Sequence, residues 1–310
     1  MNIYDNVLEL VGDTPLMRAG KLAEEFGAVG NVLLKLEFFN PGGSIKDRVA
    51  LNIIRDAEER GVLKGGGKVP PAIIEATSGN TGIGIAMVAA ARGYRAIIVM
   101  PENMSEERKK IIRAYGAELV LTPAEAGMKG AAAEAERLLA KNEGAIIAGQ
   151  FVNPANPEAH YFSTAEEIWD DCGGAVDAVV AGIGTGGTIS GLAKFFKEKD
   201  ENIKIVAVEP SESPLLSEGI AGVHKIQGIG ANFVPKVLDC DSYDEIIKVK
   251  GDDAIAMMGR LAAVEGIFCG ISSGAALRAA LEIAKREEFR GKNIIAILPD
   301  TGERYLSVLF

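Results

Sequence analysis

The stretch AIIEATSGNTGIG, residues 72–84, joins a short apolar run to a Gly- and Ser-rich turn and then to a helix-forming sequence. The second half of the chain repeats this order in AVVAGIGTGGT, residues 178–188. Short apolar runs that alternate with helices predict parallel strands whose two faces are both covered by helices. The two stretches therefore predict an α/β fold with such layers in each half of the chain.

Other segments extend the same pattern on either side of these stretches. Helix-like sequences occupy residues 84–93, 105–116 and 130–141, and another runs from the 182–188 turn through residue 196. The stretch QFVNPANP, residues 150–157, is rich in Pro and Asn and predicts a link between two lobes. The remaining apolar runs, which we expect to be strands, are residues 96–100, 118–121, 145–148, 204–208 and 294–298.

Composition excludes several classes of function. A length of 310 residues suggests two domains, and a net charge of −10 opposes non-specific binding to nucleic acid or to an anionic membrane. The N-terminal residues do not resemble a signal peptide, and Arg92 and Arg95 interrupt the apolar stretch 83–100, so no membrane span is expected.

Cysteine and histidine are too few for most metal or triad chemistry. Cys172, Cys240 and Cys269 lie far apart in the sequence, which argues against a disulfide framework or zinc site and favours a reducing cytoplasm. We expect all three to be buried packing residues. His160 and His224 are the only histidines, and we expect them to make local hydrogen bonds rather than to catalyse. No metal site is therefore expected.

Four Gly- or Ser-rich turns stand where helices are expected to begin. A helix start exposes unpaired N–H groups and carries partial positive charge, so it suits an anion. In NPGGSIKDR, residues 40–48, Ser44 is expected to cap a helix with Asp47 as its capping-box partner. Lys46 would then lie in the first turn, where the helix field favours a neutral, nucleophilic amine. Taken alone, Lys46 also fits an ordinary exposed lysine.

The other three turns have both an ordinary and a functional interpretation. TSGNTG, residues 77–82, suits a carboxylate, GIGTGGT, residues 182–188, suits a phosphate, and GISSGA, residues 270–275, offers the Ser272 hydroxyl; each also fits a simple helix cap. Gly182, Gly184 and Gly187, with Glu209 further on, also match the dinucleotide fingerprint. A nicotinamide-dependent oxidoreductase is therefore a rival hypothesis, although it leaves the other Gly-rich turns without a purpose.

Together the four turns resemble those of the fold-type II enzymes that use pyridoxal 5'-phosphate (PLP), and among these the cysteine synthase (O-acetylserine sulfhydrylase) family. The resemblance runs from GDTPL at residues 12–16 to GERYLS at residues 302–307, and HKIQGIGANFVP, residues 224–235, is similar to a segment typical of the cysteine synthases. It implies a tryptophan synthase β-like fold with two three-layer α/β/α lobes and the cofactor in the cleft between them.

The resemblance also implies a division of the chain. The N-terminal lobe would comprise residues 1–13 and 40–153, with a movable part at about 93–141. The C-terminal lobe, which binds the cofactor's phosphate, would comprise residues 14–39 and 154–310. A cytoplasmic homodimer is expected.

The activity implied is a PLP-dependent β-replacement. O-acetyl-L-serine and sulfide would give L-cysteine and acetate through an α-aminoacrylate intermediate. Lys46 would hold the cofactor as a Schiff base and later move the substrate's α-proton, and Ser272 would face the pyridine nitrogen. A neutral Ser there makes the ring a weaker electron sink than an Asp would, which suits β-elimination. Asn80 would bond the ring oxygen. The phosphate would be held by Gly184, Thr185, Gly186, Gly187 and Thr188, and the substrate by Thr77, Ser78, Gly79, Thr81, Gln150 and Gly228.

Related activities remain as alternatives. NPGGSIKDR also fits a cystathionine β-synthase-like enzyme, whereas residues 224–235 favour a cysteine synthase. Synthases that prefer O-phosphoserine tend to carry an added arginine near residues 213–224; none is present, although Lys225 lies next to that stretch. The family also implies a partner, the C-terminal tail of serine acetyltransferase.

Overall fold

The computed structural model describes residues 3–63 and 70–309. The chain divides into two compact units. Unit 1 comprises Met1–Val11, Asn40–Asn156 and Arg304–Phe310, and unit 2 comprises Gly12–Phe39 and Pro157–Glu303. The mobility of residues 93–141 and the division into working lobes stay predictions.

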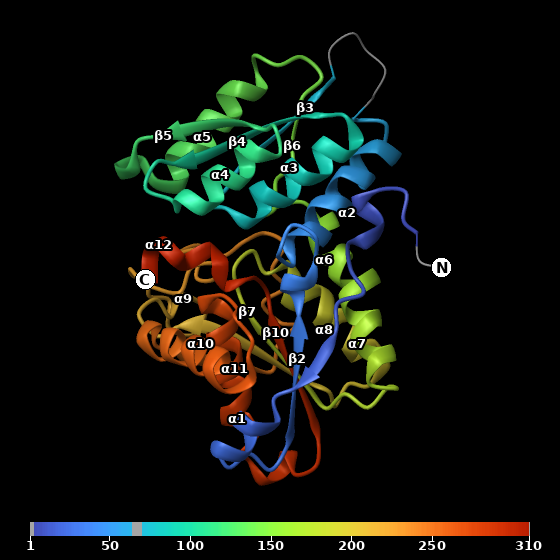
Figure 1. Cartoon of the computed structure of the whole chain (residues 1–310), viewed down its shortest axis with the longest axis vertical. Coiled ribbons are helices and arrows are strands. Elements are labelled where there is room, and N and C mark those ends of the chain that lie inside the picture. The colour runs from blue at the N-terminus through green and yellow to red at the C-terminus, as the bar shows by residue number, and fades with distance from the viewer. Residues whose placement is uncertain (1–2, 64–69, 310) are drawn as a thin grey trace. The chain divides into compact units, whose positions relative to one another are not determined.

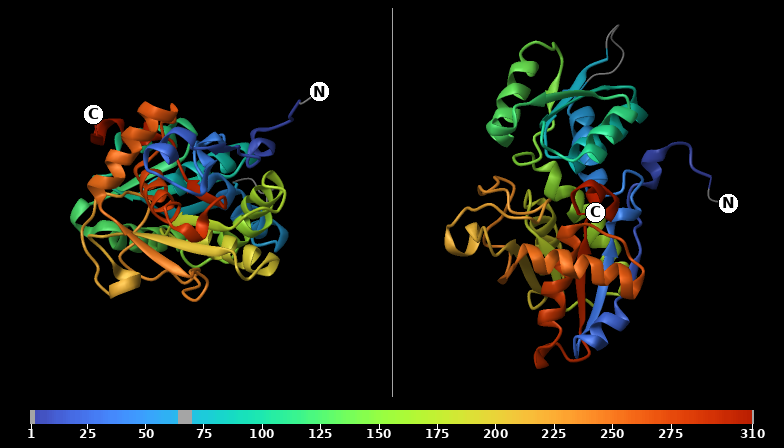
Figure 2. Two further views of the ribbon diagram at one scale, coloured as in Figure 1. Left: turned by 90° about the horizontal axis from the view of Figure 1, so that it is seen from below. Right: turned by 60° about the vertical axis from the view of Figure 1, so that its left-hand side comes forward.

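Unit 1 is built on a four-stranded parallel sheet in the order β5-β4-β3-β6 (Figure 1). Ile73 and Ile98 face a core shared with α2, α3 and α4, whereas Ile74 and Val99 face a core shared with α5. In Figure 2, right, the green α5 lies on the other side of the strands from the cyan and teal helices. The unit therefore has three layers because alternate side chains of each strand are apolar on both faces.

The elements of unit 1 have the following bounds. They are η1 (Val7–Leu10), α2 (Lys46–Glu59), β3 (Ala72–Ala76), α3 (Asn80–Arg92), β4 (Arg95–Pro101), α4 (Glu106–Ala114), β5 (Glu118–Thr122), η3 (Ala124–Ala126), α5 (Gly127–Leu139), β6 (Ile146–Ile147) and α12 (Leu306–Leu309). Two short helices span the unit boundaries along the chain, α6 (Ala155–Ala159) and η6 (Gly302–Tyr305).

Unit 2 has a six-stranded sheet in the order β1-β2-β10-β7-β8-β9, in which only β1 runs antiparallel to its neighbour among the described strands. Helices α10 and α11 cover one face, and α7 and α8 cover the other (Figure 1). The three-layer α/β/α architecture expected from the sequence is thus confirmed in each unit.

The elements of unit 2 have the following bounds. They are β1 (Leu16–Arg18), α1 (Gly20–Glu25), β2 (Asn31–Leu36), η2 (Glu37–Phe39), the π-helix η4 (His160–Thr164), α7 (Ala165–Asp171), β7 (Ala178–Gly182), α8 (Gly187–Lys199), β8 (Lys204–Pro210), α9 (Leu215–Glu218), β9 (Glu245–Val249), α10 (Gly251–Glu265), α11 (Ile271–Ile283), η5 (Glu287–Phe289) and β10 (Asn293–Leu298).

The predicted strands and helices lie where the apolar pattern placed them, to within a few residues. The capping prediction for α2 is wrong in position. Ile45, not Ser44, occupies the N-cap, and the Ser44 hydroxyl accepts a hydrogen bond from the N–H of Lys46 at 3.2 Å. The helix thus begins one residue later than expected, but the Ser44 hydroxyl makes the hydrogen bond to the N–H two residues on that a capping Ser makes. Lys46 is nevertheless in the first turn of the helix, as expected.

Candidate active site

The start of α2 places Lys46 beside α3 in unit 1. Gly84 lets the two helices approach closely, because a Cβ there would lie 2.9 Å from the carbonyl oxygen of Lys46 and 3.1 Å from the Cβ of Ala50. Next to Lys46, Asp47 is fully buried, and its carboxylate accepts a hydrogen bond from the N–H of Gly42 at 2.6 Å. Gly42 in turn accepts a hydrogen bond at its carbonyl oxygen from Arg304. These contacts hold the turn that presents Lys46.

The 77–82 turn leads from β3 into α3, with Gly79 at the N-cap. The Thr77 hydroxyl accepts a hydrogen bond from the N–H of Gly79 at 3.1 Å. A Cβ at Gly79 would overlap the side chain of Arg108, and one at Gly82 would lie 2.8 Å from Ile98. Asn80 and Thr81 are the first two residues of α3. The structure therefore places the turn's hydroxyls and N–H groups at a helix start, where an anion is favoured.

Gln150 joins this turn although it lies almost 70 residues away in the sequence. The Thr81 hydroxyl donates to Oε1 of Gln150 at 2.5 Å, and Asn156 donates to the Gln150 carbonyl oxygen at 2.7 Å. The structure thus brings together the residues of unit 1 that the sequence assigned to a carboxylate site.

Glu75 lies next to this site, and its role was not predicted from the sequence. Its carboxylate, on β3, accepts hydrogen bonds from the N–H groups of Gly149 at 2.8 Å and Gln150 at 3.4 Å. Burial raises the pKa of Glu75 to about 7, and the hydrogen bonds from Gly149 and Gln150 oppose that rise. A Glu inside an apolar strand was the available signal, because charged residues are almost never fully buried without a partner.

The 182–188 turn of unit 2 connects β7 to the long helix α8. Gly186 is the N-cap of α8 and has a φ of 85°. The N–H groups at the start of this helix of 13 residues follow directly after it. A Cβ at Gly184 would overlap the carbonyl oxygen of Gly228, and one at Gly186 would lie 2.6 Å from the Cβ of Leu238. The turn is therefore close-packed backbone that leads into a helix start, where N–H groups favour an anion.

Gly228 links this turn to Ser272. Ser272 is the second residue of α11 and is buried, and a Cβ at Gly228 would lie 3.4 Å from the Ser272 hydroxyl oxygen. The N–H of Gly230 also donates to the carbonyl oxygen of Ile183 at 2.9 Å. The segment around residue 228 thus lies against both predicted cofactor elements of unit 2.

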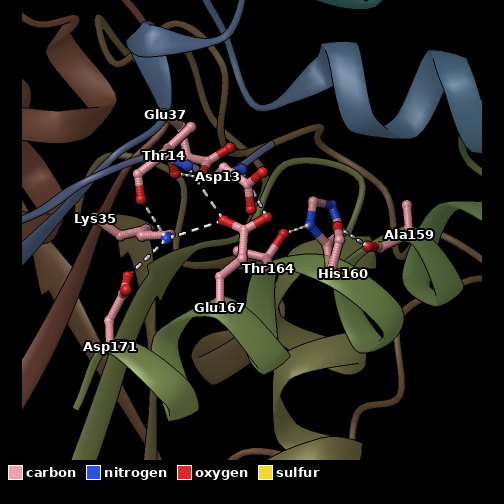
Figure 3. Close-up of polar contacts among 10 residues, drawn as sticks. Asp13, Thr14, Lys35, Glu37, Ala159, His160, Thr164, Glu167 and Asp171 are labelled. Carbon is pink, nitrogen blue, oxygen red and sulfur yellow. Dashed lines mark hydrogen bonds and ion pairs between the residues drawn. The ribbon is translucent and has the colours of Figure 1, made fainter. Parts of the chain in front are cut away.

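His160 contacts the last residue of the 182–188 turn through its ring. It is fully buried, with Nδ1 3.0 Å from the Thr164 hydroxyl (Figure 3). Its Nε2 lies 3.3 Å from the Thr188 hydroxyl. His224 contacts the Gly230 carbonyl oxygen through Nε2 at 2.9 Å. Both histidines make the local hydrogen bonds that the sequence analysis expected.

A buried lysine lies near the same helices but outside the predicted site. Lys35 donates to the Thr14 carbonyl oxygen at 2.5 Å and pairs with Glu167 at 3.0 Å and Asp171 at 3.4 Å (Figure 3). Glu167 also accepts a hydrogen bond from the N–H of Asp13 at 3.0 Å. This network fixes the N-terminal segment of unit 2 to α7, and its members lie too far apart in the sequence for any local pattern to reveal them.

The dinucleotide interpretation of the 182–188 turn lacks its acidic partner. Glu209 lies one residue before the end of β8, but its carboxylate accepts hydrogen bonds from the N–H groups of Leu216 at 2.9 Å and Ser217 at 3.1 Å. The carboxylate is therefore engaged at the start of α9 rather than directed to a ribose. This observation weakens the oxidoreductase hypothesis.

The prediction for cysteine was only partly right. Cys269 is buried, and burial raises the pKa of its thiol to about 12. Cys172 is half-buried, and Cys240 is exposed, so the expectation that all three pack inside is wrong for Cys240. Within residues 3–63 and 70–309, no cluster of three or more His, Cys, Asp or Glu side chains is arranged to bind a metal. Among the same residues, no helix has the length and hydrophobicity needed to cross a membrane.

Comparison with known proteins gives consistent results. A family model described as pyridoxal-phosphate dependent enzyme matches residues 7–300. A cysteine synthase of Staphylococcus aureus (strain Mu50) is 49% identical over 304 residues, which cover 98% of this chain and 96% of the relative. A crystal structure of cysteine synthase from Entamoeba histolytica superposes with a TM-score of 0.94 at 46% identity, covering 99% of this chain and 90% of that one. A crystal structure of an O-ureido-L-serine synthase superposes with a TM-score of 0.93 at 45% identity, covering 99% of this chain and 95% of that one.

Proposed function

Because the chain belongs to the family of pyridoxal-phosphate dependent enzymes, we propose that it catalyses a β-replacement on an activated serine. O-acetyl-L-serine and sulfide are its substrates, and L-cysteine and acetate are its products. The near full-length similarity to a cysteine synthase carries this conclusion, since the similarity covers every turn of the candidate site. The cofactor is pyridoxal 5'-phosphate.

The residues of unit 2 fit the phosphate of this cofactor. The turn at residues 184–188 combines the N–H groups of a helix start with the hydroxyls of Thr185 and Thr188, which are donors suited to a phosphate. The close approach of Gly184 and Gly186 to neighbouring backbone leaves no room for side chains and keeps those N–H groups accessible to a ligand. The proposed set is Gly184, Thr185, Gly186, Gly187 and Thr188.

The proposed roles of the remaining residues follow from their chemistry. When bound, the cofactor draws electrons from the substrate's Cα and so eases removal of the proton and the leaving group. The Lys46 amine holds the cofactor and then takes the proton from Cα. Asn80 donates a hydrogen bond to the ring oxygen. Ser272 offers a neutral hydroxyl to the ring nitrogen, and a hydroxyl provides no negative charge to stabilise a proton there.

Substrate recognition is assigned to the 77–82 turn and its partners. Hydroxyl and N–H donors at the start of α3 bind the amino acid's carboxylate and orient its Cα for proton removal. The connection of Thr81 to Gln150 at 2.5 Å supports a shared role for the two. The proposed set is Thr77, Ser78, Gly79, Thr81, Gln150 and Gly228.

Lys46→Ala tests the assignment. We expect purified wild-type protein to carry a visible cofactor band that shifts on addition of O-acetylserine and returns on addition of sulfide, with L-cysteine detected by mass spectrometry. Lys46→Ala should lose turnover, whereas Lys110→Ala, which removes an exposed lysine of α4, should retain it. Normal turnover in Lys46→Ala, or a bound nicotinamide in the wild type, would overturn the proposal.

The same assay distinguishes the related activities. O-phosphoserine in place of O-acetylserine tests the alternative leaving group, and homocysteine in place of sulfide tests a cystathionine β-synthase-like reaction. The structural similarity to an O-ureido-L-serine synthase makes formation of O-ureido-L-serine a further product to monitor. We expect O-acetylserine with sulfide to give the highest kcat/KM.

We also propose a cytoplasmic homodimer that binds the C-terminal tail of serine acetyltransferase. Exposed apolar side chains support a subunit contact; they are Ile3, Leu10, Phe39 and Phe162. The absence of disulfides among the described cysteines supports a reducing compartment. Light scattering should give the mass of a dimer, and a synthetic acetyltransferase tail should compete with O-acetylserine; a monomer or a tail that does not bind would contradict the respective proposal.

A further inference from the structure

Glu75 organises the turn that carries Gln150. It is the fourth residue of β3, only 2% exposed, and stands two residues before the 77–82 turn. Its carboxylate accepts the N–H groups of Gly149 at 2.8 Å and Gln150 at 3.4 Å, and it also receives a hydrogen bond from the Gln150 side chain. Gly149 has a φ of 69°, which suits glycine and directs successive N–H groups toward one acceptor. One buried carboxylate therefore determines the geometry of this turn.

The Gln150 amide is fixed at both ends by this arrangement. Its oxygen accepts the Thr81 hydroxyl at 2.5 Å, and its nitrogen donates to Glu75. An amide nitrogen has two hydrogens, so one remains for a further acceptor. In the proposed function that acceptor is the carboxylate of the amino-acid substrate. Glu75 thus orients the side-chain amide of Gln150. When Glu75 is ionised, its charge lies on the side of this amide away from the substrate's carboxylate.

We propose that Glu75 is a positioning residue that holds Gln150 for the substrate and takes up a proton when the substrate's carboxylate binds. This inference rests on the proposed role of Gln150 and the 77–82 turn. Two carboxylates that share one donor group repel each other, and burial strengthens the repulsion because water screens it less. The N–H of Gly149 bonds to Oε2 of Glu75 and the N–H of Gln150 to Oε1, so a neutral Glu75 keeps one carbonyl oxygen as an acceptor for this turn while its other oxygen carries the proton. Protonation therefore retains an acceptor for the turn and removes the repulsion.

The surroundings of Glu75 leave its charge uncompensated. Burial is the largest cause that raises its pKa, to about 7, and the causes that lower it are hydrogen bonds from Gly149 and Gln150. No charged side chain of the described residues is among those causes. On the strands that flank β3, Ile98 of β4 lies opposite Glu75, and β6 consists of two isoleucines. The charged residues on the helices that pack on the sheet are Lys46, Asp47, Arg48, Arg55, Asp56, Glu58 and Glu59 of α2, Arg92 of α3, Glu106, Glu107, Arg108, Lys109, Lys110 and Arg113 of α4, and Lys129, Glu134, Glu136 and Arg137 of α5.

The sign of the pH dependence follows from this coupling. Substrate binding raises the pKa of Glu75 further, and by reciprocity ionisation of Glu75 weakens binding by the same factor. Affinity for an amino acid should therefore fall as pH rises through about 7. For two charges separated by several ångströms of partly polar protein, the factor is about tenfold.

The first test uses L-alanine, an amino acid with no leaving group at Cβ. Its dissociation constant for the holoenzyme is measured from the cofactor's visible band between about pH 6 and about pH 8. Titration of alanine's own amine affects every variant equally and cancels in the comparison. We expect wild-type affinity to fall about tenfold more over this range than that of Glu75→Gln. Glu59→Gln, which removes an exposed carboxylate of α2, should follow the wild type. Parallel profiles for wild type and Glu75→Gln would overturn the proposal.

Two further measurements separate positioning from a purely structural role. Glu75→Asp keeps a titrating carboxylate, so we expect it to restore the pH dependence even where the affinity is lower; a flat profile would contradict the proposal. Near pH 7 the wild type should take up a fraction of a proton more per L-alanine bound than Glu75→Gln, as measured with an indicator dye, and this difference should vanish well below that pH. Protons exchanged by the amines of L-alanine and Lys46 are common to both proteins and cancel in the comparison. Equal proton uptake by the two proteins would overturn the inference.

Failure of the inference on Glu75 can be told apart from failure of the proposed function. Formation of cysteine from O-acetylserine and sulfide by the wild type tests the function itself. Turnover with parallel pH profiles would reject only the role of Glu75. Absence of turnover and of any spectral response to amino acids would reject the function on which the inference rests.

Discussion

The two Gly-rich turns that follow β3 and β7 have the same local plan but are stabilised differently. The 77–82 turn depends on side chains from distant segments: Gln150 contacts Thr81, and Glu75 holds Gln150. The 182–188 turn depends on backbone packed against backbone, as the overlap of a Cβ at Gly184 with Gly228 shows. A turn held by side chains can change its contacts when a proton or a ligand binds. A turn fixed by backbone contacts keeps one geometry, which suits a ligand that stays bound.

This difference matches the proposed ligands of the two turns. The cofactor's phosphate stays bound through every turnover, and a fixed set of N–H groups suits it. The substrate's carboxylate arrives and leaves in every cycle, and a site adjusted by one proton suits it. Substitutions in the two turns should therefore differ in what they change: cofactor retention for residues 182–188, and substrate affinity for residues 77–82 and their partners.

The largest effect is expected from Gly184→Ala. The added methyl would overlap the Gly228 carbonyl oxygen, so the turn must shift and its N–H groups lose their alignment. We expect cofactor affinity to fall about 100-fold, as measured by cofactor content after gel filtration and by titration with added cofactor. Gly259→Ala is the matched control, because nothing lies within 4 Å of a Cβ at that position of α10. Full cofactor retention in Gly184→Ala would show that the turn is not fixed in the way described.

Glu75→Gln should change how stability depends on pH. The pKa of Glu75 is raised from 4.5 to about 7 in the folded protein, so the folded state binds this proton more tightly than the unfolded chain. The resulting stabilisation is fully present below about pH 4.5 and is lost as pH rises through about 7. Relative to Glu75→Gln, the wild type should lose about 3 kcal/mol of unfolding free energy between about pH 4 and about pH 8.

Urea unfolding at both pH values measures this difference in the holoenzyme. Cofactor content should remain equal in the two proteins, because Glu75 lies under the substrate turn rather than the phosphate turn. A stability difference that does not vary with pH would mean that folding leaves the pKa of Glu75 unchanged, and it would remove the distinction between the two turns.

A smaller effect is expected from Thr81→Val. The substitution keeps the shape of the side chain but removes the hydroxyl that donates to Gln150 at 2.5 Å. We expect KM for O-acetylserine to rise about tenfold, since a buried acceptor is left without its donor, while cofactor affinity stays unchanged. In steady-state assays Thr122→Val serves as control, because no hydrogen-bond partner for its buried hydroxyl is found among the described residues. Equal KM values in the two variants would argue against a role for Gln150 in substrate binding.

Local pattern predicted much of the fold. Residues 72–76 and 178–182 form strands as expected, because strands covered on both faces carry continuous apolar runs. Strand β9, Glu245–Val249, was not predicted, since it lies at a sheet edge and mixes Glu and Lys with apolar residues. Ser44 lies one residue before the N-cap, Ile45, yet its hydroxyl accepts the N–H of Lys46 as a capping Ser does. The residue at which a helix begins is decided by geometry that one-dimensional spacing does not specify.

The candidate site, like the fold, was predicted from the sequence only in part. Turns whose function depends on glycine and hydroxyl residues at a helix start were visible in the sequence, and the family resemblance assigned Lys46, Asn80 and Ser272. Glu75 and Gln150 meet across 75 positions, and Lys35 and Glu167 across more than 130, so their contacts depend on the folded topology. Cys240 was misjudged because the burial of a single cysteine depends on the loop around it. Residue type therefore predicted the candidate ligand-binding turns, whereas the residues that support them required the structure.

Peptide mapping after borohydride reduction tests the central claim most directly. Reduction of the purified holoenzyme makes the bond between the cofactor and its lysine permanent, and trypsin then releases the peptide that carries the cofactor. The account predicts that the cofactor's mass lies on the peptide Leu36–Arg48, with cleavage blocked after Lys46. Attachment to any other lysine, or a protein that carries no cofactor mass after incubation with pyridoxal 5'-phosphate, would contradict it.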